Sequence, residues 1–325
     1  MYLTGKTICI AGATGMAGSA LITYLLENYP NTYIRAIHHF SEPYILHPNI
    51  EYRKADLRLS EDCLSAVADC QAVIMAAAMT GGCLLSKTEP WKQVNHNLFM
   101  NAQLFEACHK QGVERVICIG SATLYQDSLN KLSENDLDLN QDPPLNYFGI
   151  GWVTRSVEKL AQFWSTTTSL PIICIRASNI YGPYAKFDLY TANFIPALIR
   201  KAFAKIDPFE VWGDKNVVRD VIYSADFASA VIQLLDHNQF CSEVFNICSG
   251  KAITVESVVN SVLNLVQHVP TQINYINNTP LGISYRLYDS QKIQLYTGWK
   301  IQNTLEQGLA KTVSWWQLNS ETWQR

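Results

Sequence analysis

The 325-residue sequence is poor in charged residues and has no long apolar run. Only 16% of its residues are charged and the formal net charge is −3, whereas 48% are apolar. So weak a negative charge offers no basic surface for nucleic acid, which is excluded as an expected partner. No stretch approaches the roughly 20 apolar residues of a membrane span. The first residues also lack the charged start and cleavage site of an export signal. We therefore predict a globular protein that does not act at a membrane.

Paired cysteines are also missing. The nine cysteines are odd in number and scattered, and none forms a CxxC pair. Cys9, Cys118 and Cys174 lie inside apolar runs, where buried and reduced thiols are expected. The sequence therefore predicts a cytoplasmic protein without a metal site.

Short apolar runs alternate with helix-length segments through the first half of the chain. We expect strands at 7–12, 32–38, 50–57, 72–78, 115–121 and 171–178, and helices at 16–28, 61–68, 91–111 and from about 150. Hydrophobic strands in β-α-β alternation are typical of a parallel sheet that is covered on both faces. The predicted fold class is therefore α/β, with a doubly wound parallel sheet.

A glycine-rich loop follows the first predicted strand. The stretch "CIAGATGMAGSAL" places Gly12, Gly15 and Gly18 between this strand and a helix, with Thr14 and Met16 in the same loop. Glycines there permit a tight turn and close approach to a pyrophosphate, which the free N–H groups of the helix N-terminus can bind. A purely structural turn is the alternative, but the strand–turn–helix context favours a dinucleotide site.

The end of the second predicted strand bears on which dinucleotide is bound. An acid usually stands there in NAD enzymes, to bind the ribose diol. This sequence has Arg35, His38 and His39, and no acid before Glu42. The missing acid favours NADP, with His39 near its 2′-phosphate, although NAD stays possible. Alternatively, both histidines are ordinary surface residues.

The pattern loosens beyond residue 180, where strand-like runs are separated by irregular segments. We predict a dinucleotide-binding Rossmann domain over residues 1–180. Residues 181–325 are predicted to form a smaller substrate-binding region, interleaved with late elements of the Rossmann domain.

Several motifs occur in order along the chain: "ADL" (55–57), "MAAA" (75–78), "IGSATLY" (119–125) and "RASNIYGP" (176–183). Together with the glycines they resemble the extended short-chain dehydrogenase/reductase family, the sugar-nucleotide epimerases, dehydratases and reductases. The resemblance covers essentially the whole chain and is nearest to the GDP-fucose synthase branch. It implies a nucleoside-diphosphate sugar as the substrate, and a homodimer.

The resemblance also implies roles for single residues. Asp56 and Leu57 would flank the adenine, Ala77 and Ala78 would line the cofactor, and Ser121 would lie beside the nicotinamide and the sugar. A further set would cradle the nucleoside diphosphate: Asn179, Asn193, Val211, Trp212, Arg219 and Arg286. Arginine suits a diphosphate because its guanidinium is a planar fork of donors; surface ion pairing is the alternative for both arginines.

The stretch "NYFGIGWVTRSVEKL" departs from the family. The family places a proton-transferring tyrosine and, four residues later, a lysine on one side of this helix. Aligning the pattern on Gly151 and Glu158 puts Ile150 and Thr154 at these two positions. Starting instead from Tyr147 puts Gly151 at the lysine position, so a shift of register does not restore the pair.

Two further positions differ from the GDP-fucose synthase branch, which uses a cysteine and a histidine for epimerisation. The matching positions hold Thr123 and Asn193, so the usual mechanism of that branch is not expected.

Three hypotheses about function follow. The first is an enzyme with a relocated acid/base, for which Tyr147 leads over Tyr125, Tyr184 and Tyr190, with Ser121 and Thr123 orienting the substrate. The second is a catalytically degenerate protein that binds cofactor or sugar nucleotide as a sensor or subunit. The third is a scaffold, which would have no need of the glycines and arginines.

By the same resemblance, the helix at 91–111 and the helix from Ile150 would form the homodimer interface. The apolar positions predicted for it are Leu98, Phe99, Leu104, Phe105, Val157, Leu160 and Trp164; the alternative is that all of them belong to the core of the subunit.

Overall fold

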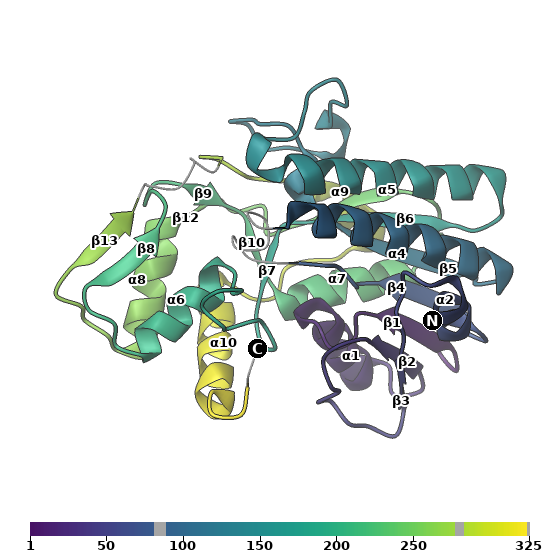
Figure 1. Ribbon diagram of the computed structural model, residues 1–325, viewed down its shortest axis with the longest axis horizontal. Helices are drawn as coiled ribbons and strands as arrows, with labels where there is room; N and C mark the ends of the chain where they lie inside the picture. Colours follow the sequence, from purple (N-terminus) through teal and green to yellow (C-terminus); the bar gives the residue numbers. More distant parts are fainter. Residues whose placement is uncertain (81–88, 277–282, 324–325) are drawn as a thin grey trace.

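A seven-stranded parallel sheet forms the centre of the protein. The computed structural model describes residues 1–80, 89–276 and 283–323 (Figure 1). The strand order is β11-β6-β5-β4-β1-β2-β3, and every neighbouring pair is parallel. These strands are β1 (Thr7–Ala11), β2 (Tyr33–His38), β3 (Ile50–Lys54), β4 (Ala72–Met75), β5 (Arg115–Ser121), β6 (Ile172–Ala177) and β11 (Val244–Ile247). The predicted α/β fold with a doubly wound parallel sheet is confirmed.

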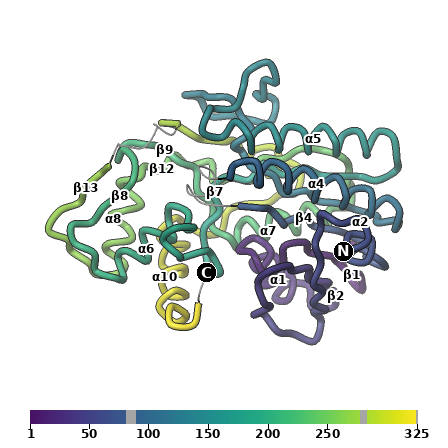
Figure 2. The backbone as a smooth tube through the Cα atoms, in the orientation of Figure 1, coloured from purple at the N-terminus to yellow at the C-terminus, as the bar shows by residue number. Residues whose placement is uncertain are grey.

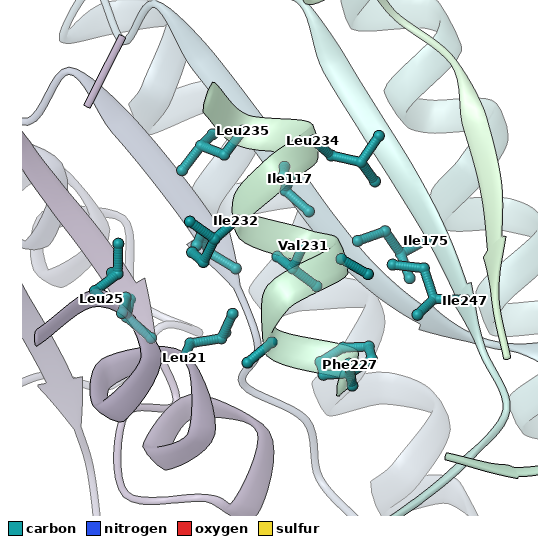
Figure 3. Packing of buried hydrophobic residues seen from close by; sticks show 14 of the residues in the cluster. Leu21, Leu25, Ile117, Ile175, Phe227, Val231, Ile232, Leu234, Leu235 and Ile247 are labelled. Carbon is teal, nitrogen blue, oxygen red and sulfur yellow. The ribbon is translucent and has the colours of Figure 1, made fainter. Parts of the chain in front are cut away.

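Helices cover both faces of this sheet, which explains why its inner strands are almost continuously apolar. One face carries α1 (Met16–Asn28) and α7 (Ser224–Asp236). The other carries α2 (Ser60–Val67), α4 (Pro90–Lys110) and α5 (Phe148–Thr167). In Figure 3, Phe227 and Val231 of α7 lie among Leu21 of α1, Ile175 of β6 and Ile247 of β11, all in one buried cluster.

The element boundaries follow the sequence pattern closely. Helix α1 spans the predicted residues, whereas β3 ends at Lys54, three residues before the predicted limit. The reason is a side-chain contact: the carboxylate of Asp62 in α2 accepts the N–H of Asp56 at 2.6 Å. This bond turns the chain out of the sheet into the helix.

A smaller unit lies beside the sheet (Figures 1 and 2). We call it the outer lobe; it is formed by residues 181–223, 253–276 and 305–323. Its core contains buried side chains from α6, α8, α10 and β8, and β13, which pairs in parallel with β8, packs partly buried side chains against it. The chain returns from the lobe to the large sheet through α7 and β11. Besides α7 and β11, the elements after β6 are β7 (Asn179–Tyr181), α6 (Phe194–Phe203), β8 (Phe209–Trp212), β9 (Val218–Arg219), β10 (Val221–Tyr223), β12 (Ile253–Thr254), α8 (Val255–Val266), β13 (Ile273–Ile276), α9 (Gln291–Thr297) and α10 (Leu305–Asn319).

Short 3-10 turns connect β5 to α5: η1 (Ala122–Leu124), η2 (Glu134–Asp136) and η3 (Leu145–Tyr147). Among the described residues, no helix is long and apolar enough to cross a bilayer. The cysteines in this part of the chain are free, and Cys9, Cys118 and Cys174 are buried as predicted.

Most side chains that we expected at a dimer interface lie within the subunit. Leu104, Phe105 and Val157 are buried in the core between α4, α5 and the sheet. Leu98, Leu160 and Trp164 are partly buried against that core. Only Phe99 of the set is exposed, at 56%, so a dimer would have to use a different face of these helices.

Candidate active site

The glycine loop between β1 and α1 is built for close backbone contact. Gly12 has φ +81°, and a Cβ atom there would lie 2.6 Å from the backbone of Ala77. At Gly18 a Cβ would lie 2.3 Å from the Gly12 carbonyl oxygen. At Gly15, by contrast, a Cβ would meet only this same oxygen, at 3.3 Å. Gly12 and Gly18 are therefore required by the fold, whereas Gly15 leaves space above the loop.

The first turn of α1 offers donors to an anion. Gly15 is the N-cap residue, and among the described residues no side-chain capping bond is made at this helix N-terminus. Such a terminus, following a glycine turn, fits a pyrophosphate. Thr14 and Met16 lie within the loop, and Thr14 is buried.

A charged cluster lies where β2 and β3 end. Asp56 accepts hydrogen bonds from Nε and Nη2 of Arg58, and Nε2 of His39 lies 3.8 Å from its carboxylate. The bonds from Arg58 lower the pKa of the Asp56 carboxyl to about 2. Arg58 also reaches Nε2 of His96 on α4, at 3.3 Å. Of these four residues, His39 and Asp56 were predicted from the sequence to bind the cofactor, whereas Arg58 and His96 were not.

Arg35 and His38 take other positions. The guanidinium of Arg35 is buried, pairs with Glu51 at 2.9 Å and donates to the carbonyl of Ala68. Nδ1 of His38 lies 3.0 Å from the carbonyl oxygen of Ser41. Alternate residues of a strand face opposite sides of its sheet, so Arg35 is turned toward the α2 side. His39 is therefore the one member of the predicted basic group that contacts Asp56.

The segment after β4 is held by a side chain that the sequence analysis also missed. Asn97, buried on α4, accepts the N–H of Met79 at 2.8 Å and donates to the Met79 carbonyl at 3.3 Å. This clamp fixes the chain directly after Ala77 and Ala78, the residues predicted to line the cofactor. The signal in the sequence is an asparagine within a helix-length segment, because asparagine side chains commonly bond to backbone groups.

Ser121 and Thr123 lie together at the carboxyl end of β5. The Ser121 hydroxyl accepts the N–H of Thr123 at 3.2 Å. The Thr123 hydroxyl oxygen is buried and has no hydrogen-bond partner within the described structure. An unpaired buried hydroxyl is unusual, and it is available to a ligand at this end of the sheet.

Helix α5 passes close to this point. A Cβ on Gly120 would lie 2.9 Å from the Thr154 methyl group, and one on Gly151 would lie 3.0 Å from the Thr123 carbonyl. Thr154 is thus buried beside the residue preceding Ser121, and its hydroxyl donates to the Ile150 carbonyl at 2.9 Å.

Arg155, which follows Thr154 in the sequence, does not replace the lysine that the family has at position 154. Arg155 is buried and donates to the carbonyls of Leu124 and Gln141, at 2.8 and 2.6 Å. Its guanidinium also lies over the ring of Trp152, at 4.8 Å. Arg155 therefore fixes the connection between β5 and α5.

Two of the alternative tyrosines are engaged in packing and the third is exposed. Burial raises the pKa of the Tyr125 hydroxyl, which bonds to Asn246, Arg176 and the Ser133 carbonyl. The ring of Tyr184 is stacked within an aromatic cluster of the outer lobe, and Tyr190 is 78% exposed. Among the described residues, no hydrogen bond joins any of the three to Ser121.

Tyr147 lies with the two predicted diphosphate-binding arginines. The Arg286 guanidinium sits over its ring, 4.3 Å from the centroid. Arg219 donates to the carbonyls of Val218 and Ile283, and burial lowers the pKa of its guanidinium while Arg286 acts in the same direction. Within the described part of the chain, neither arginine has a carboxylate partner. Two neighbouring cations without acids are the arrangement expected of an anion site.

The other predicted substrate residues are more dispersed. Asn179 is exposed and donates to the Asp220 carbonyl at 3.3 Å, next to Arg219. Asn193 is the exposed N-cap residue of α6. On β8, Val211 is buried, whereas Trp212 is 60% exposed and has Lys201 over its ring at 5.5 Å.

The doubly wound sheet, the glycine loop and the uncapped helix define the chain as a Rossmann-type dinucleotide-binding protein. Residues 8–248 match the model of the NAD dependent epimerase/dehydratase family, and the chain belongs to that family. The nicotinamide dinucleotide predicted from the glycine loop is the cofactor class of this family.

Similar proteins cover nearly the whole chain. GDP-L-fucose synthase of Sinorhizobium fredii is 32% identical over 321 residues, 96% of each chain. A structure of MoeE5 with UDP-glucuronic acid and NAD is 25% identical, with a TM-score of 0.84 over 96% of this chain and 99% of that one. A GDP-L-fucose synthetase from Naegleria fowleri bound to NADP is 18% identical, with a TM-score of 0.83 over 99% and 96%.

Proposed function

We propose that this protein is a nicotinamide-dependent enzyme of sugar-nucleotide metabolism whose acid/base arrangement is atypical. The observation that carries the substrate class is the placement of Arg219 and Arg286 together, half-buried and without a carboxylate partner among the described residues. Planar guanidinium groups bind phosphate oxygens through two parallel hydrogen bonds. The names of the similar proteins, which include UDP and GDP sugars, support a nucleoside-diphosphate sugar and leave the base open.

The two ligands would meet near Ser121. The dinucleotide would lie along the β1–α1 loop, with its nicotinamide directed toward Ser121, and would supply the acceptor or donor of a hydride. The diphosphate would lie on the arginines, with the sugar between them and Ser121. The unpaired hydroxyl of Thr123 is available to a hydroxyl or keto oxygen of that sugar.

We further propose NADP rather than NAD as the cofactor. His39 and Arg58 are both cationic or ionisable and lie at the strand ends where the ribose of a bound dinucleotide is expected. Either could attract a 2′-phosphate. Because Asp56 already occupies Arg58, the preference for NADP should be moderate and sensitive to salt.

The proton-transfer step is where this chain departs from its family. If the register on Gly151 and Glu158 holds, Ile150 carries no proton, and Thr154 is a buried methyl and hydroxyl instead of a cation. A catalytically degenerate protein that binds both ligands is therefore the second candidate, favoured by the packing of Thr154 against Gly120. A pure scaffold is disfavoured by the arginine pair.

A binding experiment tests the proposed substrate class. Calorimetry of the wild type with UDP, GDP and their sugar conjugates tests the substrate class, with Arg219→Gln as the variant expected to lose binding. Arg53→Gln is the control, because Arg53 pairs with Glu51 on β3. Binding of none of these ligands, or equal binding by Arg219→Gln, contradicts the assignment.

Turnover then separates the enzyme from the degenerate protein. We expect the double change Ile150→Tyr with Thr154→Lys to raise the rate of nicotinamide reduction or oxidation, followed by absorbance. General acid–base catalysis typically contributes about 10²–10⁴-fold. A brisk wild-type rate that the double change abolishes would mean that the acid/base lies elsewhere and that position 150 is only structural.

We also propose that the protein is cytoplasmic and a homodimer. The free buried thiols support the first. The exposed rings of Trp91, Phe99 and Phe163 on α4 and α5 support the second, since large exposed apolar side chains commonly mark interfaces.

A further inference from the structure

Four aromatic side chains connect the outer lobe to the glycine loop. Tyr44 follows β2, Tyr184 follows β7, Trp315 lies on α10, and Trp323 follows α10. The ring of Tyr44 is stacked on that of Tyr184, with centroids 5.0 Å apart at 15°, and meets Trp323 edge-on at 4.9 Å. Trp315 completes the group, 5.0 Å from Tyr184 and 5.1 Å from Trp323. Offset and edge-on ring pairs at these distances are favourable beyond the area that they bury.

The hydroxyl of Tyr44 reaches into the loop itself. It donates to the carbonyl of Thr14 at 2.6 Å and lies 2.5 Å from the hydroxyl oxygen of Ser19. Ser19 is fully buried, and its oxygen lies 2.7 Å from the Gly15 carbonyl and 3.3 Å from the Ala13 carbonyl. Each hydroxyl has one proton to donate, so Tyr44 holds the Thr14 carbonyl and Ser19 holds one neighbouring carbonyl, of which that of Gly15 is the nearer.

These contacts determine where the loop N–H groups point. The peptide unit is planar and almost always trans, so the N–H of a residue points away from the carbonyl that precedes it. The Thr14 carbonyl that Tyr44 holds therefore sets the direction of the Gly15 N–H, and the Gly15 carbonyl that Ser19 holds sets that of the Met16 N–H. Those donors belong to the stretch in which a pyrophosphate is bound, and no glycine can impose this orientation by itself.

The outer lobe holds the ring that carries this hydroxyl. Tyr184 adopts φ +62°, a left-handed conformation that is uncommon for an aromatic residue. The indole N–H of Trp323 donates to the next carbonyl, that of Ala185, at 2.8 Å. The segment after β7 is therefore fixed on both sides, by ring contacts and by this hydrogen bond, and it presents a rigid surface to Tyr44.

We propose that Tyr44 is a positioning residue for dinucleotide binding, and that the aromatic cluster of Tyr44, Tyr184, Trp315 and Trp323 holds it in place. The residue acts through the Thr14 and Ser19 contacts and not through the ligand. This inference rests on the proposed function, since it requires that the loop bind a dinucleotide. It adds that side chains of the outer lobe set the affinity of a site that is built from the first strand and helix.

The test uses the variant Tyr44→Phe, which keeps the ring and removes the hydroxyl. A hydrogen bond of this kind contributes about 0.5–1.5 kcal/mol, which corresponds to a roughly two- to twelvefold weaker affinity. We expect that loss for NADP and NAD alike in calorimetry, with GDP and UDP binding unchanged. Amide exchange of the ligand-free protein should be faster in peptides that cover residues 12–19. Trp323→Ala should act in the same direction.

Tyr33→Phe is the matched control, because that side chain is 56% exposed at the start of β2. Wild-type affinity and wild-type exchange in Tyr44→Phe would overturn the inference while leaving the proposed function intact. An equal loss of dinucleotide and nucleoside-diphosphate binding would overturn it too, because it would show general damage. If the wild type binds no dinucleotide, both proposals fail.

Discussion

Replacing Tyr147 separates two roles that the sequence alone leaves open. The Arg286 guanidinium lies 4.3 Å from the ring centroid, so the ring holds this arginine in place whether or not the hydroxyl takes part in chemistry. A cation–π contact contributes about 0.5–1 kcal/mol when exposed and about 2 kcal/mol when desolvated. Both side chains are half-buried, so we take about 1 kcal/mol, or roughly a fivefold change in Kd.

Tyr147→Ala should therefore weaken the binding of GDP or UDP about fivefold, because the Arg286 guanidinium loses its support. Tyr147→Phe keeps the ring and should bind within about twofold of the wild type. Turnover of the phenylalanine variant reports on the hydroxyl. If the hydroxyl is the relocated acid/base, kcat should fall by about 10²–10⁴ at constant Kd.

Calorimetry gives the affinities, and absorbance of the reduced nicotinamide gives the rates. Tyr190→Ala is the control, since that tyrosine is 78% exposed. Wild-type affinity in Tyr147→Ala would refute the proposed support of Arg286. Loss of affinity in the phenylalanine and alanine variants alike would show that the hydroxyl, rather than the ring, holds the ligand.

Three other changes have definite expected outcomes. Gly15→Val should abolish dinucleotide binding, because its side chain fills the space above the loop; a Cβ there also lies a tight 3.3 Å from the Gly12 oxygen, so a slightly lower Tm is expected, and wild-type affinity would contradict the prediction. Glu158→Ala should lower the free energy of unfolding by about 3 kcal/mol in urea titration, because the partner, Arg176, stays buried without its bidentate acid; a change below about 1 kcal/mol would mean that other contacts suffice. Phe99→Glu with Phe163→Glu should convert a dimer to a monomer in light scattering, since both rings are more than half exposed; a wild-type monomer at micromolar concentration would refute the dimer.

Local patterns in the sequence were enough to predict the sheet and its loop. The β1–α1 unit follows from an apolar run, three spaced glycines and a helix-length segment, all between Thr7 and Asn28. Such features are encoded by neighbours in the chain, so no tertiary information is needed. The end of β3 was missed because it depends on a single bond from Asp62 to the backbone of Asp56.

Contacts between distant segments could not be predicted in this way. Nothing in the sequence around Tyr147 indicates that Arg286 covers its ring. The two residues meet only when the segment at Tyr285 pairs with Val218 of β9. Arg35 shows the same limit on a smaller scale. It was one of three basic residues noted at the end of the second predicted strand, but strand alternation and its pairing with Glu51 turn it toward the α2 side of the sheet.

The return of the chain through α7 and β11 affects how the protein can be made. The nascent chain completes β6 at residue 177. Its neighbour on the side away from β5 is β11, which ends only at Ile247. Until that length has left the ribosome, the edge of β6 stays unpaired and the apolar face beneath α7 stays uncovered, which invites association with other chains. The large sheet therefore cannot be completed before the first part of the outer lobe, from β7 to β10, has been synthesised. Cutting the gene at residue 180 would yield an aggregating fragment instead of a portable cofactor-binding module.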